Sequence, residues 1–383
     1  MKPTTLIILT LAAGAASPAF AQSSPLEYES SVEAVTVISA VHEARGGVDN
    51  EALLYEVSLD NRVEKVLASG LQVSGRLTLR GQRDHPLRPG FLGDFDAGNN
   101  PTGAYSGLSS SAPGDETGAR GSVEAAYIEF DGGYGEARIG RDRGVASRFY
   151  EGAPSALSHA RLNNPYLDPN GIKTIRTNHD LTGPSAKLSY ASPRILGLRV
   201  GGSYTPDMEA EGLDRQSGPT DISNAFEVAA NLSRRLNQFD TRVQASLAWS
   251  TADVEAPLGA AQDGVETVST GLSFEFPAFT LGGSWLSSDN GFEFGDYEAW
   301  EIGAGFDVGE TELSLNYGES SDDLVSQSSK AISVAAAREI TDELKLALAY
   351  QDEEVETAGG TRSGAGFVVE ITLSSDFLEI SRN

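Results

Sequence analysis

The side chains in this sequence that could do chemistry are charged rather than nucleophilic. Arg62, Arg76, Arg80 and Arg138 each lie in a stretch where apolar and polar residues alternate, and each falls on the polar face. A period of two is that of a β-strand, whose successive side chains point to opposite faces. Guanidinium groups fixed along one wall would orient dipolar solutes by their charge, without covalent chemistry.

Enzyme chemistry has little support in the sequence. Cysteine is absent and no His-Glu-x-x-His motif occurs, so a catalytic zinc site is not indicated. The strongest hydrolase alternative is Ser158-His159 with one of the many acids, but the chain has no Gly-x-Ser-x-Gly elbow. The sequence therefore predicts that the protein is not an enzyme. Its histidines are His42, His85, His159 and His179.

Acidic residues recur between the alternating stretches. Examples are Asp207, Glu209, Glu211 and Asp214, and again Asp352, Glu353, Glu354 and Glu356. Carboxylates bind Ca²⁺ where two or three converge, but in exposed loops they more often only keep the surface hydrated. We assign no metal ligands and no cofactor, with structural calcium at the loop acids as the one alternative left open.

Composition excludes several classes of protein. The formal net charge is −27, from 55 acidic and 28 basic residues, which argues against a nucleic-acid partner because phosphate binding needs clustered Lys and Arg. Hydrophobic residues make up only 39% of the chain, too few for a large conventional core. A wall of strands that are each half polar fits this composition better.

The N-terminus is typical of an exported protein. Residues 1–21 carry Lys2, an apolar stretch over 6–16 and a small-residue cleavage site at 19–21, so they are expected to be a signal peptide. The rest, 22–383, is expected to be one domain. No other segment approaches the roughly 18 consecutive apolar residues of a membrane-spanning helix, so any membrane crossing would be made by strands.

The period-two stretches predict about sixteen strands, and their connections alternate between short and long. Seven short turns and eight longer loops put all turns on one rim and all loops on the other, as in an up-and-down barrel and unlike a Greek-key sandwich. The long connections are expected at approximately 42–51, 83–118, 143–171, 206–221, 252–263, 289–296, 319–327 and 354–363.

The two faces of the strands indicate which side meets lipid. In FDTRVQASLAW, residues 239–249, Val243, Leu247 and Trp249 share one face while Arg242 and Gln244 share the other. The polar faces carry too many charges for a packed interior but suit a water-filled one. The sequence thus predicts an all-β, transmembrane, antiparallel up-and-down β-barrel with its apolar faces outward.

Two motifs give the chain a resemblance to a known family. Residues 139–142, Ile-Gly-Arg-Asp, and residues 190–206, YASPRILGLRVGGSYTP, resemble the general diffusion porins of the Gram-negative outer membrane, especially those of alphaproteobacteria. Two departures stand out. The chain ends at Asn383 rather than in the family's Phe, the nearest being Phe377, and residues 149–152 read Phe-Tyr-Glu-Gly where many relatives have a Pro-Glu-Phe-Gly-like turn.

The resemblance implies a sixteen-stranded barrel in the outer membrane whose third loop folds into the lumen. It also implies a homotrimer, with loop 83–118 reaching a neighbouring barrel, and contact with outer-membrane lipid and lipopolysaccharide. The third loop corresponds to residues 143–171, in which Pro154 to Ala160 is expected to form a short helix. Glu151 and Asp168 of that loop would then face the arginine wall. The predicted pore constriction is Arg62, Arg76, Arg80, Arg138, Glu151 and Asp168.

The function that follows is a porin, a water-filled channel for passive diffusion of ions and small hydrophilic solutes. Two alternatives stay open. A substrate-specific outer-membrane channel would show a track of aromatic residues along the lumen, and a surface-binding barrel would not conduct. We expect a mild cation preference, because acids gather at the mouth, although the arginines of the constriction act against it.

Overall fold

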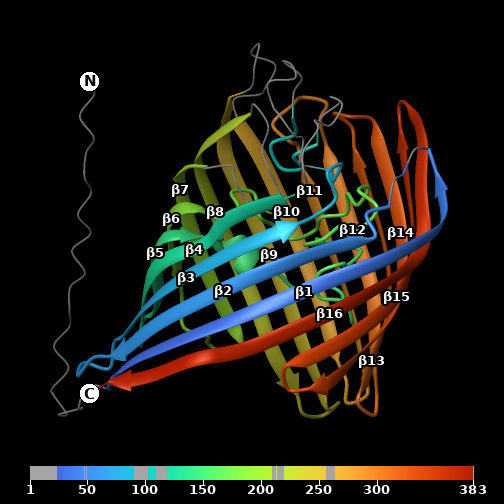
Figure 1. Ribbon diagram of the computed structural model, residues 1–383. Helices are drawn as coiled ribbons and strands as arrows, with labels where there is room; N and C mark the ends of the chain where they lie inside the picture. Colours follow the sequence, from blue (N-terminus) through green and yellow to red (C-terminus); the bar gives the residue numbers. More distant parts are fainter. Residues whose placement is uncertain are drawn as a thin grey trace.

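Sixteen antiparallel strands form one closed barrel in a computed structural model of the chain (Figure 1). The structure describes residues 24–46, 48, 50–89, 102–108, 119–208, 213, 220–255 and 264–382. The expected signal peptide lies outside the described residues. Each strand pairs with its neighbours in sequence, and β1 closes the barrel on β16, which confirms the predicted fold class and strand number.

The strands are β1 (Leu26–Arg45), β2 (Leu53–Val66), β3 (Gln72–Arg83), β4 (Ala119–Gly132), β5 (Gly135–Asp142), β6 (Ser185–Ala191), β7 (Leu198–Asp207) and β8 (Asp221–Leu236). They continue with β9 (Thr241–Glu255), β10 (Gly264–Glu275), β11 (Phe279–Ser288), β12 (Tyr297–Val308), β13 (Thr311–Asp322), β14 (Gln327–Thr341), β15 (Leu344–Thr357) and β16 (Gly360–Arg382). The only helix of the described residues is α1 (Val145–Arg148), and no described helix is long and apolar enough to cross a membrane.

The alternation of apolar and polar residues places the strand faces as expected. On β9, Leu247 is 58% exposed on the outer surface, while Ser250 on the opposite face is fully buried inside the barrel. Ile302 and Leu315 on β12 and β13 also lie on the outer surface. The apolar face of residues 239–249 therefore looks outward, and the polar face looks into the lumen.

The order of the connections is as predicted, but several bounds differ. Only residues 323–326 connect β13 and β14, where a long loop was expected over 319–327, and the third loop extends beyond residue 171, as described below. Residues 354–363 were expected to be a long loop, but β15 continues to Thr357 and β16 begins at Gly360, so only residues 358–359 connect them. The strand continues because the polar residues keep the period of two. Glu353 points into the lumen and is 3% exposed, whereas Glu354 lies on the outer face and pairs with Lys330 at 2.6 Å.

The end of the chain is a strand rather than a free tail. β16 pairs with β1 from Ser363 opposite Arg45 down to the register of Leu26 and Arg382. Phe377 is a one-residue bulge in this pairing, since Leu378 lies opposite Ser30 and Asp376 opposite Ser31. The residues after Phe377 thus extend the seam that closes the barrel.

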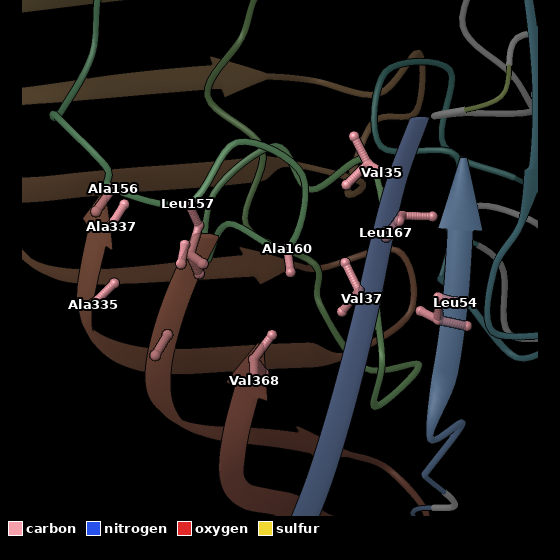
Figure 2. Packing of buried hydrophobic residues seen from close by; sticks show 12 residues of the cluster. Val35, Val37, Leu54, Ala156, Leu157, Ala160, Leu167, Ala335, Ala337 and Val368 are labelled. Atoms are coloured by element: carbon pink, nitrogen blue, oxygen red, sulfur yellow. The ribbon is translucent and has the colours of Figure 1, made fainter. Parts of the chain in front are cut away.

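The third long loop lies inside the barrel, where it packs on the inner wall (Figure 2). Ala156, Leu157, Ala160 and Leu167 of the loop meet apolar inward-facing residues of five strands. The wall side of this cluster is Val35, Val37, Leu54, Ala335, Ala337, Ala347, Ala349 and Val368. The apolar lumen residues of β1, β2, β14, β15 and β16 therefore anchor the loop.

Candidate functional site

Residues 143–184 line the inside of the barrel in two passes, and we call them the loop belt. The first pass begins with α1, which packs against β6 to β9, and it runs along the inner faces of β9 to β16. It reaches β3 at Tyr166, whose ring lies 4.7 Å from the guanidinium carbon of Arg80. The loop belt therefore contacts nearly the whole circumference of the wall.

Glycines on adjacent strands make room for the first pass. A Cβ on Gly271 of β10 would lie 1.9 Å from the carbonyl oxygen of Glu151. A Cβ on Gly282 of β11 would lie 2.6 Å from the carbonyl oxygen of Gly152, and one on Gly305 of β12 would lie 3.1 Å from Pro154. Real Cβ contacts are not as short as the first two, and the third is tight, so Gly271 and Gly282 leave room for the first pass that another residue would fill.

A single carboxylate fixes the next part of the first pass. Glu370 of β16 accepts hydrogen bonds from the backbone N–H groups of Ser158, His159 and Ala160 at 2.8 to 2.9 Å, and from the Ser158 hydroxyl at 2.6 Å. The helix expected over 154–160 does not form. Wall side chains take the backbone donors instead, since Ala156 donates to the Ser314 hydroxyl.

The return pass, residues 169–184, corrects the boundary of the loop. A strand was expected to begin at residue 172, but β6 begins at Ser185. The segment is extended between the wall and the lumen, which gives its side chains the same period of two. Thr177 and His179 are fully buried against the wall, where His179 bonds Ser250 and Ser269. Arg176, Asn178 and Asp180 point the other way, into the cavity described below.

Side-chain amides tie the two passes together. The Asn164 N–H donates to the carbonyl oxygen of Ile175, and its side-chain oxygen accepts from the N–H of Asn178. The side-chain amide of Asn163 donates to the Thr177 hydroxyl, and its oxygen accepts from the Thr177 backbone N–H. The same amide also donates to Glu301 of β12 at 2.6 Å. Asn163 and Asn164 therefore join the two passes.

Part of the second long loop covers the mouth of the same barrel. Tyr105 is buried and its hydroxyl donates to the carbonyl oxygen of Asn178 at 2.8 Å. Backbone atoms of residues 104–106 bond Asn290, between β11 and β12. The described residues 102–108 thus pack within their own chain. The segments 90–101 and 109–118 lie outside the described residues.

The loop belt encloses a cavity of about 320 Å³. Apart from Tyr105, every residue that lines this cavity comes from the loop belt, and arginines and tyrosines dominate the lining. We call it the loop cavity. Its lining is Tyr105, Arg143, Ser147, Arg148, Tyr150, Arg161, Asn164, Pro165, Tyr166, Arg176, Asn178 and Asp180.

The four arginines of the loop cavity differ in their partners. Arg143 pairs with Asp180 at 2.9 Å and with Glu124 at 3.3 Å, and Arg148 pairs with Glu136. Arg176 donates to the carbonyl oxygens of Ser106 and Pro89. Arg161 forms no ion pair with a described carboxylate, and its Nε is buried without a hydrogen-bond acceptor.

The four arginines predicted to line one wall lie at different depths in the barrel. Arg80 pairs with Glu56 at 2.6 Å and touches the loop belt through Tyr166. Arg76 lies four residues nearer the turns, about 13 Å along a strand that rises roughly 3.3 Å per residue. It stands opposite Arg62, and these two side chains are about half exposed and pair with Asp60 and Glu64.

Arg138 takes part in a separate network of ion pairs. It lies near the turn end of β5 and contacts Glu129, Glu136 and Asp142 at 2.6 to 2.8 Å. Its guanidinium carbon is 4.7 Å from the centre of the Tyr127 ring. Its charge is therefore surrounded by carboxylates of its own wall.

The two predicted acids, Glu151 and Asp168, form hydrogen bonds that hold the loop belt in its conformation, and they do not face the arginines. Glu151 accepts from Asn231 of β8 at 3.0 Å and from Gln244 of β9 at 3.4 Å. Asp168 is fully buried and accepts backbone N–H groups of residues 170, 171 and 173, which closes a turn. Within the described residues, neither acid forms an ion pair with Arg62, Arg76, Arg80 or Arg138.

Sequence reasoning missed the four arginines that line the loop cavity. Arg143, Arg148 and Arg161 lie in the segment that was expected to enter the lumen, but only its acids were considered. Arg176 was placed in a strand. The signal was present: in residues 175–181 one parity reads Ile, Thr, His and Leu, and the other is Arg176, Asn178 and Asp180.

The Ser158-His159 pair has structural partners. The Ser158 hydroxyl lies 2.8 Å from Nδ1 of His159, whose Nε2 is 3.3 Å from Glu56. However, the hydroxyl and the neighbouring N–H groups are bonded to Glu370, so no donor there is left to stabilise an oxyanion. Among the described residues, no group of His, Asp and Glu side chains has the geometry to hold a metal ion. Of the acids considered for calcium, Glu209, Glu211 and Asp214 lie outside the described residues.

Comparison with known proteins adds a family. A family model described as Gram-negative porin matches residues 9–358. No curated protein sequence matches the chain.

Three solved structures with the same fold are distant in sequence. The anion-selective porin from Comamonas acidovorans is 17% identical, with a TM-score of 0.53 over 92% of this chain and 100% of that one. OprB from Pseudomonas putida is 9% identical, with a TM-score of 0.59 over 92% and 94% of the two chains. The outer-membrane channel DcaP of Acinetobacter baumannii is 11% identical, with a TM-score of 0.55 over 95% and 100%. At these identities the likeness concerns the fold.

Proposed function

The chain belongs to the Gram-negative porin family, and from that premise we propose that solutes cross it through the loop cavity. It is an outer-membrane protein that forms a diffusion channel. The observation that carries the proposal is the lining of the cavity: the loop belt packs its apolar side chains on the wall and turns polar ones inward. A water-filled passage needs such a lining.

We assign different roles to the residues expected at the constriction. Arg80 flanks the narrow section, because it contacts Tyr166 of the loop belt. Arg62, Arg76 and Arg138 line the wider lumen on the turn side, and Glu151 and Asp168 hold the loop belt in place. The narrow section itself is lined by Arg143, Arg148, Arg161 and Arg176.

We also propose a homotrimer in outer-membrane lipid and lipopolysaccharide. One structure of the same fold, OmpT of Vibrio cholerae, is described as a trimer form. The continuous apolar outer surface, with Leu247, Ile302 and Leu348 more than half exposed, supplies contact area for neighbouring barrels and for lipid. A monomeric mass in mild detergent, with the barrel still folded, would contradict the trimer.

A substrate-specific channel is the second candidate, and one observation favours it. Tyr105, Tyr150 and Tyr166 line the loop cavity, and aromatic residues along the lumen are what a substrate-specific channel was expected to show. A surface-binding barrel gains no comparable support. We propose no enzymatic activity, because the Ser158 hydroxyl is bonded to Glu370.

Conductance in planar lipid bilayers tests these functions. A diffusion channel gives ohmic steps, in threes for a trimer, that no single solute saturates. Saturation by one solute would identify a specific channel. Silence from correctly folded protein would refute both and leave the surface-binding alternative. Swelling of liposomes in sugars of graded size would give the size limit set by the loop cavity.

A further inference from the structure

We propose that the loop cavity is a binding site for small organic solutes that carry an oxyanion group, a carboxylate or a phosphate, with Arg161 as the residue that holds this group. The inference rests on the proposed path through the loop cavity. It reverses the mild cation preference expected from the composition of the whole chain.

The balance of charge in the lining points to an anion. Four guanidinium groups line the cavity, and Asp180 is the one carboxylate of the lining. Arg143 and Arg148 also pair with Glu124 and Glu136 behind the lining, whereas Arg161 forms no ion pair with a described carboxylate.

Among the carboxylates buried inside the barrel, Glu56 is paired with Arg80 and Glu353 with Lys173. Salt screens the exposed acids of the chain beyond about 8 Å at physiological ionic strength. Charges that line a narrow section act at shorter range in a lower effective dielectric, so they decide which ion enters.

Arg161 is the arginine whose charge is available to a solute. Its guanidinium carbon lies 5.6 Å from the centre of the Tyr166 ring, and its Nε is buried without an acceptor. The carboxylate of Glu301 interacts electrostatically with Arg161, but its oxygens accept their hydrogen bonds from Asn163 and Asn316. The guanidinium group lines the cavity without an ion pair to a described carboxylate, and an oxyanion in the cavity would supply that partner.

The geometry of the guanidinium group selects the class of ligand. Its planar set of donors matches the two oxygens of a carboxylate or phosphate in a bidentate pair, which halide ions cannot form. The surrounding rings of Tyr105, Tyr150 and Tyr166 provide apolar contact for the rest of the solute. A cavity of about 320 Å³ accommodates a small organic acid.

The test compares two charge-removing variants in planar bilayers. Arg161→Gln removes the proposed binding group, and Arg235→Gln is the matched control, because Arg235 is an exposed arginine paired with Asp240 at the turn end of β8. For each protein, the reversal potential is measured in a KCl gradient. The block of current is then titrated with succinate, with inorganic phosphate and with uncharged glycerol.

We expect the wild-type channel to prefer chloride and to be blocked by succinate or phosphate but not by glycerol. In Arg161→Gln, block should weaken about tenfold and the reversal potential should move toward cations. In Arg235→Gln both should match the wild type. The comparison of succinate with phosphate identifies which oxyanion is preferred.

Two outcomes would overturn the inference while leaving the channel function intact. One is a conducting wild type that prefers cations or is not blocked by either oxyanion. The other is an Arg161→Gln channel with wild-type block and reversal potential. If folded wild-type protein does not conduct at all, the proposed function itself fails, which separates the two conclusions.

Discussion

The carbonyl oxygen of Glu151 occupies the space that a side chain on Gly271 would fill, since a Cβ there would lie 1.9 Å away. The loop belt and the inner wall are therefore fitted to each other at the level of single atoms. A barrel wall with ordinary side chains at this position could not hold the first pass so close. The width of the channel consequently depends on wall residues that never touch a solute.

Gly271→Ala should displace the first pass from the wall into the loop cavity and lower single-channel conductance. Overpacking of this kind costs about 1–3 kcal/mol. Gly81→Ala is the control, because the nearest atom to its added Cβ is 3.8 Å away, at the carbonyl oxygen of Arg120. Equal conductance in the two variants would show that Gly271 does not position the loop belt.

Glu370→Gln should loosen the first pass where it crosses β16. The variant removes the charge that accepts three backbone N–H groups and one hydroxyl, and hydrogen bonds to charged groups are worth about 1.5–3 kcal/mol. Amide hydrogen exchange at Ser158, His159 and Ala160 should become at least about tenfold faster. Glu310→Gln removes an exposed carboxylate at a turn and should leave those amides unchanged.

Leu247→Arg and Gln244→Arg put the same charge on opposite faces of β9. On the outer face, an arginine near the middle of the bilayer costs about 2–4 kcal/mol. On the inner face, an arginine at position 244 would lie beside Glu151, to which Gln244 already donates. Denaturant unfolding in lipid vesicles should rank Leu247→Arg as the less stable variant. The reverse ranking would contradict the assignment of the two faces.

Lys173→Met should destabilise the return pass more than the double variant Lys173→Met/Glu353→Leu. Lys173 is buried and contacts Glu353 at 3.3 Å and Gln351 at 3.0 Å. Removing one partner of a buried ion pair costs about 3–5 kcal/mol, because the other charge stays buried, whereas an apolar pair is better tolerated. Hydrogen exchange of residues 169–175 would measure both effects. Additive effects of Lys173→Met and Glu353→Leu would show that the two charges are not coupled.

The barrel was predictable from the sequence because apolar and polar residues alternate along each strand. On β9 every second residue meets the outer surface, so local alternation and global architecture agree, and the same holds for Leu313 and Leu315 on β13. The ends of the strands were harder to predict from the sequence. Glu353, Glu354 and Glu356 were read as loop residues because they are acidic, although their alternation continued the strand.

The loop belt was predictable only in part, because its conformation depends on partners far away in the sequence. No local pattern shows that Glu370 replaces the helical hydrogen bonds of residues 158–160, or that Gly271 clears a path for Glu151. Residues 175–181 alternate because they lie between a wall and a cavity, which local sequence cannot distinguish from a strand. For the same reason, the sequence did not predict that the four arginines line the cavity.

The contacts of the loop belt also order the steps by which the barrel assembles. Its polar anchors include Glu227 on β8 and Glu370 on β16, which are translated after the loop belt itself, whereas its apolar anchors on β1 and β2 are translated before it. Contacts between residues far apart in sequence form slowly, because the chain between them must first be ordered. The bonds to Glu370 require β16, the last strand, which closes the barrel at its seam with β1, to be in place. A barrel still unsealed at that seam would have a wide lumen, and closure of the seam and narrowing of the passage would be completed in a single late step.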